Sequence, residues 1–175
     1  MARVTRIGVV SDTHGKVHPA LAELFAGVDA IVHAGDIGGG HVLAALRALA
    51  PVISVAGNND DATGEEIARV KLGTLRILLT HILPRPHKPA PRVTESLRAE
   101  PADVVIFGHS HLPHSEVIQG VRYFNPASAG PRRFDLPVAA GLLEKQRREW
   151  KAMHVALDER SVEALKRHMN QLSRR

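Results

Sequence analysis

The sequence predicts an α/β fold with a mixed or double sheet, and three patterns carry that prediction. Strand-like apolar runs alternate with helical patterns near the N-terminus, paired strand patterns follow, and an amphipathic helical pattern comes last. The chain has 175 residues, of which 44% are hydrophobic and 23% charged, a composition typical of one globular domain. We therefore expect one domain over residues 1–175, with a C-terminal helix at about residues 161–173.

The N-terminal part predicts two strand and helix units followed by a third strand. Ile7–Val10 is an apolar run typical of a buried strand, and His18–Phe25 carries apolar residues at helical spacing. Ala30–His33 predicts the second strand and His41–Leu49 the second helix, and the run Val52–Val55 predicts the third strand. Units of this kind build a parallel sheet through right-handed crossovers.

From Glu66 onward the pattern changes to hairpins. Two apolar runs, Ile67–Lys71 and Leu75–Leu79, flank Leu72–Thr74, which is typical of a β-hairpin. The rest of the chain predicts a loop, a helix, a strand and two further hairpins, over Pro84–Arg92, Val93–Ala99, Val104–Phe107, Glu116–Phe124 and Val138–Leu157, the last with its tip at Lys145–Arg148. One face of the final helix is apolar and consists of Val162, Leu165, Met169 and Leu172.

The composition excludes several kinds of site. The chain has no cysteine, which excludes zinc ribbons, iron–sulfur clusters and thiol nucleophiles. Any metal must therefore bind to His, Asp, Glu or Asn, and the 11 histidines make such a site plausible. No apolar run approaches the roughly 18 residues of a membrane helix, and the N-terminal apolar stretch is too short for a signal peptide, so we expect a cytoplasmic protein without a membrane partner. The net charge of +5 permits phosphate-bearing partners, but the 3% of aromatic residues argues against base-stacking platforms.

Polar side chains follow the predicted strands at the points where the strands end. They come from five strand ends and comprise Asp12, His14, Asp36, Asn58, His81, His109 and His111. Because the carboxyl ends of parallel strands share one edge of a sheet, these side chains should meet where ligands bind. Oxygen and nitrogen donors of this kind suit Mn, Fe, Ni, Zn or Co.

The spacing within these clusters favours a site for two metal ions. Asp12 and His14 are two residues apart, as are His109 and His111, so alternate side chains can point the same way. Asp36 stands alone at its strand end and could bridge two cations with its two oxygens. Two ions about 3.5–4 Å apart can bind phosphate oxygens and acidify a shared water for in-line attack.

Taken singly, each residue has a structural explanation. Asp12 could cap the helix that follows it, Asp36 could serve a turn, and His81 could be a core histidine with satisfied hydrogen bonds. Asn58 could be a turn residue with positive φ, and His109 could belong to a surface loop. Their joint occurrence at the strand ends favours a common site.

Five motifs occur in a fixed order along the chain, followed by a sixth. They are Asp12–His14, Gly35–Asp36, Gly57–Asp60, Thr80–His81, Gly108–His111 and the Asn-Pro-Ala-Ser sequence of Asn125–Ser128. In this order they resemble the calcineurin-like metallophosphoesterase superfamily, and within it the short single-domain phosphodiesterase group of bacteria and archaea. The resemblance covers residues 11–128 and implies a two-sheet β-sandwich flanked by helices.

The resemblance also implies roles for individual residues. Asp12, His14 and His111 would hold one divalent ion, Asn58, His81 and His109 the other, and Asp36 both. The expected ions are two per chain, with Mn first and Ni, Fe, Zn, Co or Mg as alternatives. A hydroxide bridging the ions would attack phosphorus, with Asn58 stabilising the developing charge and Asp60 supporting the metal ligands from the second shell.

Two departures from the family pattern bear on the substrate. Many phosphomonoesterases of the superfamily have His directly after the motif Asn, where this chain has Asn59. Without that acid, phosphodiesters or aryl esters become favoured over alkyl monoesters, and we expect Asn59 and Arg132 to contact the substrate. Arg133, beside Arg132, could also bind a phosphate, although both could belong to a solvated loop. Ile82–Pro84 follows Thr80–His81, where the family usually has Gly-His, which alters the loop over the site.

Three alternatives to a phosphodiesterase stay open at this point. The first is a phosphomonoesterase. The second is a catalytically weak metal-binding scaffold for protein interaction, because the retromer subunit that shares this fold looks like a scaffold that lost productive metal chemistry. The third is a nucleic-acid-binding protein, which the +5 charge permits but no motif supports, so nucleic acid is expected only as a substrate. A homodimer is expected from the resemblance to short relatives. The physiological substrate and metal are not determined by the sequence.

Overall fold

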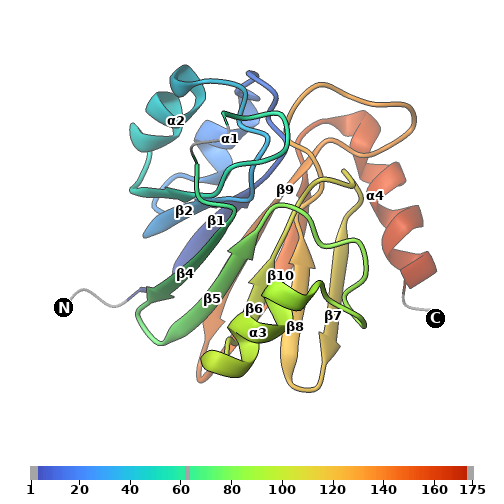
Figure 1. Cartoon of the computed structure of the whole chain (residues 1–175). Coiled ribbons are helices and arrows are strands. Elements are labelled where there is room, and N and C mark those ends of the chain that lie inside the picture. Colours follow the sequence, from blue (N-terminus) through green and yellow to red (C-terminus); the bar gives the residue numbers. More distant parts are fainter. Residues whose placement is uncertain (1–3, 62–63, 173–175) are drawn as a thin grey trace.

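The computed structural model describes residues 4–61 and 64–172, and in it two five-stranded sheets pack face to face (Figure 1). The first sheet has the order β10-β9-β1-β2-β3 and the second the order β4-β5-β6-β8-β7. The strands are β1 (Arg6–Val10), β2 (Ala30–His33), β3 (Val52–Ser54), β4 (Ile67–Leu72), β5 (Leu75–Thr80), β6 (Val104–Ile106), β7 (His114–Ile118), β8 (Val121–Asn125), β9 (Ala139–Gln146) and β10 (Glu149–Ala156). This arrangement confirms the predicted α/β fold and the sandwich.

Alternation along the strands explains why the sheets pack in this way. In β1, Ile7 and Val9 enter the core between the sheets, whereas Val10 packs against the helices on the other face. In β5, Ile77 and Leu79 face the inter-sheet core, and Leu78 faces outward. Because successive side chains of a strand point to opposite faces, each sheet needs cover on both sides.

The helices supply the outer cover. Helices α1 (Ala20–Leu24) and α2 (Gly40–Arg47) pack on the first sheet through buried residues such as Leu21 and Leu46. Helix α3 (Pro91–Ala99) covers the second sheet through Val93, and α4 (Glu159–Leu172) lies against β10. Within the described residues, no helix has the length and apolarity that crossing a bilayer requires.

Strand directions confirm the parallel core of each sheet. β1, β2 and β3 run parallel in the first sheet, as do β5, β6 and β8 in the second, and antiparallel hairpins extend both. As Figure 1 shows, the loops after β1, β2, β5 and β6 lie at one end of the sandwich and the hairpin turns at the other. The fold thus brings the predicted strand-end motifs to one edge.

Some boundaries differ from the prediction. α1 is limited to Ala20–Leu24, and α3 begins at Pro91, inside the expected loop, because proline is well suited to the first turn of a helix. The last hairpin has a shorter tip than expected, since β9 continues to Gln146 and Arg147 turns the chain at φ 56°. α4 begins at Glu159 rather than near residue 161, and the expected end at residue 173 lies outside the described residues.

Candidate metal centre

The structure brings all seven predicted ligands together at the end of the sandwich where the parallel strands finish. Asp12 follows β1, Asp36 follows β2 and Asn58 follows β3, all in the first sheet. His81 directly follows β5, and the loop after β6 carries His109 and His111, in the second sheet. The centre therefore lies across the seam between the two sheets, and neither sheet provides it alone.

The first half of the centre consists of Asp12, His14 and His111. The Nε2 atom of His111 lies 3.2 Å from Asp12 Oδ1 and 3.3 Å from the Nε2 atom of His14. One donor atom from each of the three residues lies within 4.8 Å of the others, a spacing that fits a single ion. Asp12 and His111 are buried and His14 is half-buried.

The second half is arranged around the side-chain oxygen of Asn58. Asn58 Oδ1 lies 2.8 Å from His109 Nδ1 and 3.1 Å from His81 Nε2. His81 is buried, whereas Asn58 and His109 are exposed. This half thus has a buried floor and a rim open to solvent, where a substrate can enter.

Asp36 lies between the two halves. Its Oδ1 atom is 3.4 Å from His81 Nε2, and its Oδ2 atom is 3.8 Å from His14 Nε2. Each carboxylate oxygen therefore faces a histidine of a different half. This is the geometry expected of a carboxylate that two cations share.

Hydrogen bonds orient the ligand atoms. His81 Nδ1 lies 2.6 Å from the carbonyl oxygen of Ala34, which can only accept, so Nδ1 carries the hydrogen and Nε2 presents its lone pair to the centre. Asp12 Oδ2 accepts the Ser11 hydroxyl at 2.6 Å and the His109 amide at 3.0 Å. These contacts fix the carboxylate and leave its other oxygen directed at His111.

The charges of the centre fit cations. Asp12 and Asp36 are both buried, and no Lys or Arg among residues 4–61 and 64–172 lies within ion-pair distance of either carboxylate. Asp12 Oδ1 is buried without a hydrogen-bond partner within the same part of the chain, as is His111 Nδ1. Burial opposes ionisation of Asp12, but the nearby His111 ring and the hydrogen bond from Ser11 hold its pKa below the ordinary value. A buried carboxylate oxygen that faces histidines is suited to a divalent ion.

The backbone at the centre is strained in a way the sequence did not indicate. Five of the seven predicted ligands adopt left-handed backbone angles, with φ of 53° at Asp12, 46° at His14, 54° at Asp36, 68° at His109 and 58° at His111. Such angles cost non-glycine residues roughly 1 kcal/mol or more each and concentrate at functional sites. The neighbouring Gly108 permits close approach, because a Cβ atom there would lie 2.0 Å from Ser11 Oγ.

Asp60 connects the loops beside the candidate ligands. Its carboxylate accepts the amides of Ile37 at 2.8 Å, Gly38 at 3.0 Å and Gly57 at 2.9 Å. Burial disfavours the charged form, yet these backbone hydrogen bonds lower the pKa of Asp60 below its ordinary value. The contacts connect the loop that carries Asp36 to the loop that carries Asn58.

His33 is a fully buried histidine beneath the centre. The Gly35 amide donates to His33 Nδ1, so Nε2 carries the hydrogen and donates to Thr13 Oγ1 at 2.9 Å. The Thr13 hydroxyl in turn donates to the carbonyl oxygen of Ile37 at 2.8 Å. Burial lowers the pKa of His33 to about 4, which keeps the ring neutral at pH 7.

The Asn-Pro-Ala-Ser motif connects the two sheets behind the centre. Asn125 Nδ2 donates to the carbonyl oxygen of Gly108 at 2.8 Å, and the Ser128 hydroxyl donates to that of Asp12 at 2.9 Å. Ala127 has φ 74°, a left-handed angle that is unfavourable for a residue with a Cβ atom. The motif therefore holds the loops that carry Asp12 and His109.

The two expected substrate contacts have different surroundings. Asn59 lies at the centre, where its Nδ2 donates to Asp36 Oδ2 at 2.6 Å. Arg132 has other partners, because its guanidinium donates to Asp158 at 2.7 Å and to the carbonyl oxygen of Leu136, and its contact with the substrate stays a prediction. The neighbouring Arg133 is the arginine that reaches the centre, with Nη2 3.3 Å from His14 Nε2.

Comparison with known proteins identifies relatives of this arrangement. A family model described as the calcineurin-like phosphoesterase superfamily domain matches residues 5–148. A probable metallophosphoesterase of Methanothermobacter thermautotrophicus is 35% identical over 136 residues, which cover 70% of this chain and 76% of that protein.

Solved structures share the fold. A single mutant of Vps29 from Entamoeba histolytica superposes with a TM-score of 0.73 at 22% identity, covering 89% of this chain and 94% of that one. A structure described as a novel archaeal phosphodiesterase has a TM-score of 0.67 at 23% identity, covering 86% of this chain and 99% of its own. At these identities the superpositions bear on the fold alone, so activity has to be argued from the residues of the centre.

Proposed function

The chain belongs to the calcineurin-like phosphoesterase superfamily, and we propose that it hydrolyses phosphodiesters with two divalent metal ions. One observation carries the proposal. The two oxygens of Asp36 face His81 and His14, which belong to different halves of the centre. A carboxylate placed in this way can bind one ion through each oxygen, which supports a site for two ions.

Each ion would take its ligands from one half of the centre. Asp12, His14 and His111 would hold the first and Asn58, His81 and His109 the second, with Asp36 common to both. The donors are oxygen and imidazole nitrogen, which permit Mn, Fe, Ni, Zn, Co or Mg, and of these we propose Mn. When bound, the ions supply charge that polarises the phosphate and acidifies the attacking water.

The residues of the chain contribute orientation and charge. Ala34 and Ser11 hold His81 and Asp12 in position for their ligand roles. Arg133 is exposed beside His14, where a guanidinium can pair with phosphate oxygens and stabilise the charge that develops on them. The exposed amide of Asn58 stands at the rim and can hydrogen bond to the same group.

The preference for diesters rests on Asn59. Its amide lies beside Asp36, but an amide cannot donate a proton to a leaving alkoxide at neutral pH. A phosphodiester or an aryl ester with a good leaving group needs less assistance from an acid than an alkyl monoester does. The alternatives are a phosphomonoesterase and a metal-binding scaffold for protein interaction. The presence of all seven proposed ligands supports an enzyme over the scaffold.

Turnover with artificial substrates tests the proposal. The protein is stripped with EDTA, Mn, Ni, Mg or Zn is restored, and cleavage of bis-p-nitrophenyl phosphate is compared with that of p-nitrophenyl phosphate. We expect activity to return with metal and to favour the diester. Preference for the monoester would contradict the role given to Asn59, and bound metal without any turnover would favour the scaffold.

A histidine pair provides the matched control. His109→Ala removes a proposed ligand, and we expect it to abolish metal-restored turnover. His87 is exposed on the proline-rich loop and pairs with Glu116, away from the centre, so His87→Ala should leave turnover unchanged. Full activity in the His109→Ala variant would contradict the proposed ligand set.

The proposal also covers the location, the substrate and the assembly of the protein. We propose a cytoplasmic enzyme that acts on a small phosphodiester, assembles as a homodimer, and contacts nucleic acid only as a substrate. Sedimentation velocity measures the assembly directly, and a monomer at micromolar concentration would contradict the dimer.

A further inference from the structure

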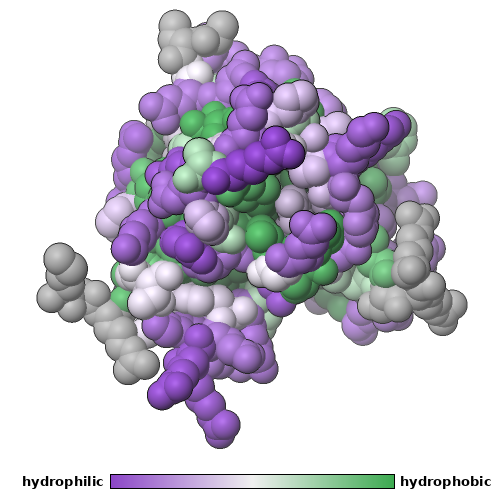
Figure 2. All heavy atoms as spheres, turned by 60° about the horizontal axis from the view of Figure 1, so that its bottom comes forward, coloured by the Kyte–Doolittle hydropathy of each residue, from purple (hydrophilic) through white to green (hydrophobic). Residues whose placement is uncertain are grey.

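A cavity of about 640 Å³ opens between the two sheets at the end of the sandwich remote from the metal centre. Leu75 and Val104, the first residues of β5 and β6, line this cavity, whereas the proposed metal ligands His81, His109 and His111 come after the ends of these strands. Figure 2 views this end of the molecule and shows hydrophobic atoms in a hollow surrounded by hydrophilic ones. The cavity is therefore separate from the centre described above.

The floor of the cavity is part of the inter-sheet core. Leu75, Val104 and Leu143 line it and are all nearly inaccessible to solvent, and they belong to the core cluster between the sheets. At the rim, Val117 is an exposed apolar side chain. A ligand that enters the cavity contacts apolar side chains at the rim and on the floor, and these contacts suit an apolar or aromatic body.

An unpaired donor lies in the wall. Trp150 lines the cavity, and its Nε1 atom is buried without a hydrogen-bond acceptor in the described part of the chain. Because indole can only donate, this N–H needs an acceptor, and its burial without one is unfavourable. A ligand oxygen placed in the cavity would supply that acceptor.

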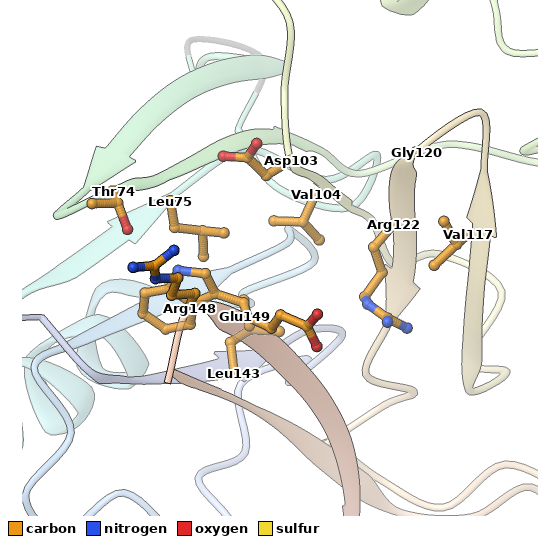
Figure 3. A pocket seen from close by; sticks show the side chains of 11 residues that line it. Thr74, Leu75, Asp103, Val104, Val117, Gly120, Arg122, Leu143, Arg148 and Glu149 are labelled. Carbon is orange, nitrogen blue, oxygen red and sulfur yellow. The ribbon is translucent and has the colours of Figure 1, made fainter. Parts of the chain in front are cut away.

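Two arginines approach the same space. In Figure 3 the guanidinium groups of Arg148 and Arg122 lie at opposite sides of the cavity. Arg122 donates one N–H to Ser115 Oγ at 2.9 Å, and Arg148 has no ion pair or hydrogen bond within the described residues. Both retain donors that a ligand can use.

The acidic residues of the lining do not cancel these charges. Asp103 is already neutralised by Arg76, through contacts of 2.6 Å and 3.2 Å. Glu149 is the remaining carboxylate of a lining that also contains two guanidinium groups and the unpaired indole donor. The balance of unpaired groups thus favours an acceptor with negative charge.

We propose that this cavity binds a small amphipathic anion, which has an apolar or aromatic body and one carboxylate, sulfonate or phosphate group. The body would lie on Leu75, Val104 and Leu143, and the anionic group would accept from Trp150 Nε1 and from Arg122 and Arg148. The proposal does not depend on the chemistry of the metal centre.

The position of the single tryptophan allows a direct test. Trp150 is the only tryptophan of the chain, so its emission reports on this cavity. The metal-loaded protein is titrated with 8-anilinonaphthalene-1-sulfonate, and saturable quenching of Trp150 with one site per chain is expected. Arg148→Gln and Arg122→Gln should each weaken binding about fivefold or more, since a charge-assisted hydrogen bond is lost.

Arg147→Gln is the matched control, because Arg147 is exposed at the neighbouring position of the hairpin tip but does not line the cavity. This variant should bind the probe with an affinity within about twofold of the original, because the charge of an exposed side chain outside the cavity is screened by solvent and salt. Trp150→Phe keeps an aromatic ring but removes the N–H, and calorimetry should show weaker binding. Equal affinity in the arginine variants and Arg147→Gln would overturn the proposal.

Neutral and anionic competitors separate charge recognition from adsorption to an apolar surface. N-phenyl-1-naphthylamine shares the aromatic body but lacks the sulfonate, and it should bind more weakly. Naphthalene-1-carboxylate and naphthalene-1-phosphonate distinguish the two sources of negative charge, and displacement of the probe by either one supports the site. Binding of the neutral compound as tightly as the sulfonate, or displacement by neither anion, would contradict it.

Discussion

Asn59 holds Asp36 through two hydrogen bonds, one to each carboxylate oxygen. Its backbone amide donates to Oδ1 at 2.9 Å and its side-chain Nδ2 donates to Oδ2 at 2.6 Å. The residue that departs from the monoesterase pattern thus positions the carboxylate shared by the two halves of the centre. This contact uses one of the two hydrogens on the side-chain amide nitrogen, so the direct substrate contact expected of Asn59 stays a prediction.

Replacing Asn59 should therefore lower the affinity for metal ions more directly than it changes the contact with the substrate. Asn59→Ala keeps the amide contact but removes the contact to Oδ2, and we expect metal affinity to fall about 10-fold or more, as for other groups that orient metal ligands. Titration of the stripped protein with Mn measures this change. Asn59→His should raise cleavage of the monoester relative to the diester, and an unchanged ratio would contradict the explanation of substrate preference.

Asp60 should stabilise the fold as well as the centre. Asp60→Asn removes the charge that the amides of Ile37, Gly38 and Gly57 share, and we expect a loss of about 2 kcal/mol in the free energy of unfolding. Because the folded state lowers the pKa of Asp60, its contribution is present above the ordinary pKa and is lost as the pH falls through the folded value. Urea denaturation of metal-free protein measures it, with the exposed Asp61→Asn as control. Equal losses in both variants would contradict the role of Asp60.

Buried histidines should make the protein sensitive to acid. Burial lowers the pKa of His33 and of His154 to about 4, whereas the unfolded chain titrates near 6.5. As the pH falls from 6.5 toward 4, the unfolded state takes up protons that the folded state does not, so stability declines. The loss approaches roughly 3 kcal/mol per residue at the acid end.

His154 allows this to be measured away from the metal centre. Its Nε2 donates to the carbonyl oxygen of Asn125 at 2.7 Å, and glutamine can donate to the same oxygen without titrating. His154→Gln should therefore flatten the dependence of unfolding free energy on pH between 6.5 and 4, in metal-free protein. His41→Gln, at an exposed position, should leave the slope as it is, and a slope unaffected by His154→Gln would contradict the assignment.

Two adjacent arginines should have separable effects. Arg133 faces His14, so Arg133→Gln should lower kcat/KM for the diester about 10-fold, as expected for loss of a charged phosphate contact, and leave the melting temperature unchanged. Arg132 connects its loop to Asp158 at the start of α4, so Arg132→Gln should lower the melting temperature and spare the activity of the folded protein. The opposite assignment of effects would contradict both roles.

Much of the fold could be predicted from local patterns. Short apolar runs such as Ile7–Val10 and Leu75–Leu79 identified strands, because a strand buried on both faces needs apolar residues in succession. The site followed from the same logic, since Asp12, Asp36 and His109 come directly after such runs and parallel strands end together. The left-handed angles of Asp12 and Asp36 could not be predicted, because aspartate in isolation does not reveal φ.

Tertiary contacts account for the remaining differences. The sequence gives no reason to separate Arg132 from Arg133, since only the approach of α4 brings Asp158 to the first of them. The cavity at Trp150 also depends on how two sheets diverge at one end, and its lining comes from segments far apart in the chain. Local periodicity carries no information about such a gap.

The stoichiometry of Mn binding in the original protein and in Asp36→Asn tests the central claim most directly. For the original protein we expect two ions per chain and restored cleavage of the diester. For Asp36→Asn we expect the loss of at least one ion and a decrease in turnover of about 100-fold, as for removal of a group that stabilises the transition state. Circular dichroism establishes that the variant remains folded. One ion per chain in the original protein, or full turnover by folded Asp36→Asn, would contradict the dinuclear centre.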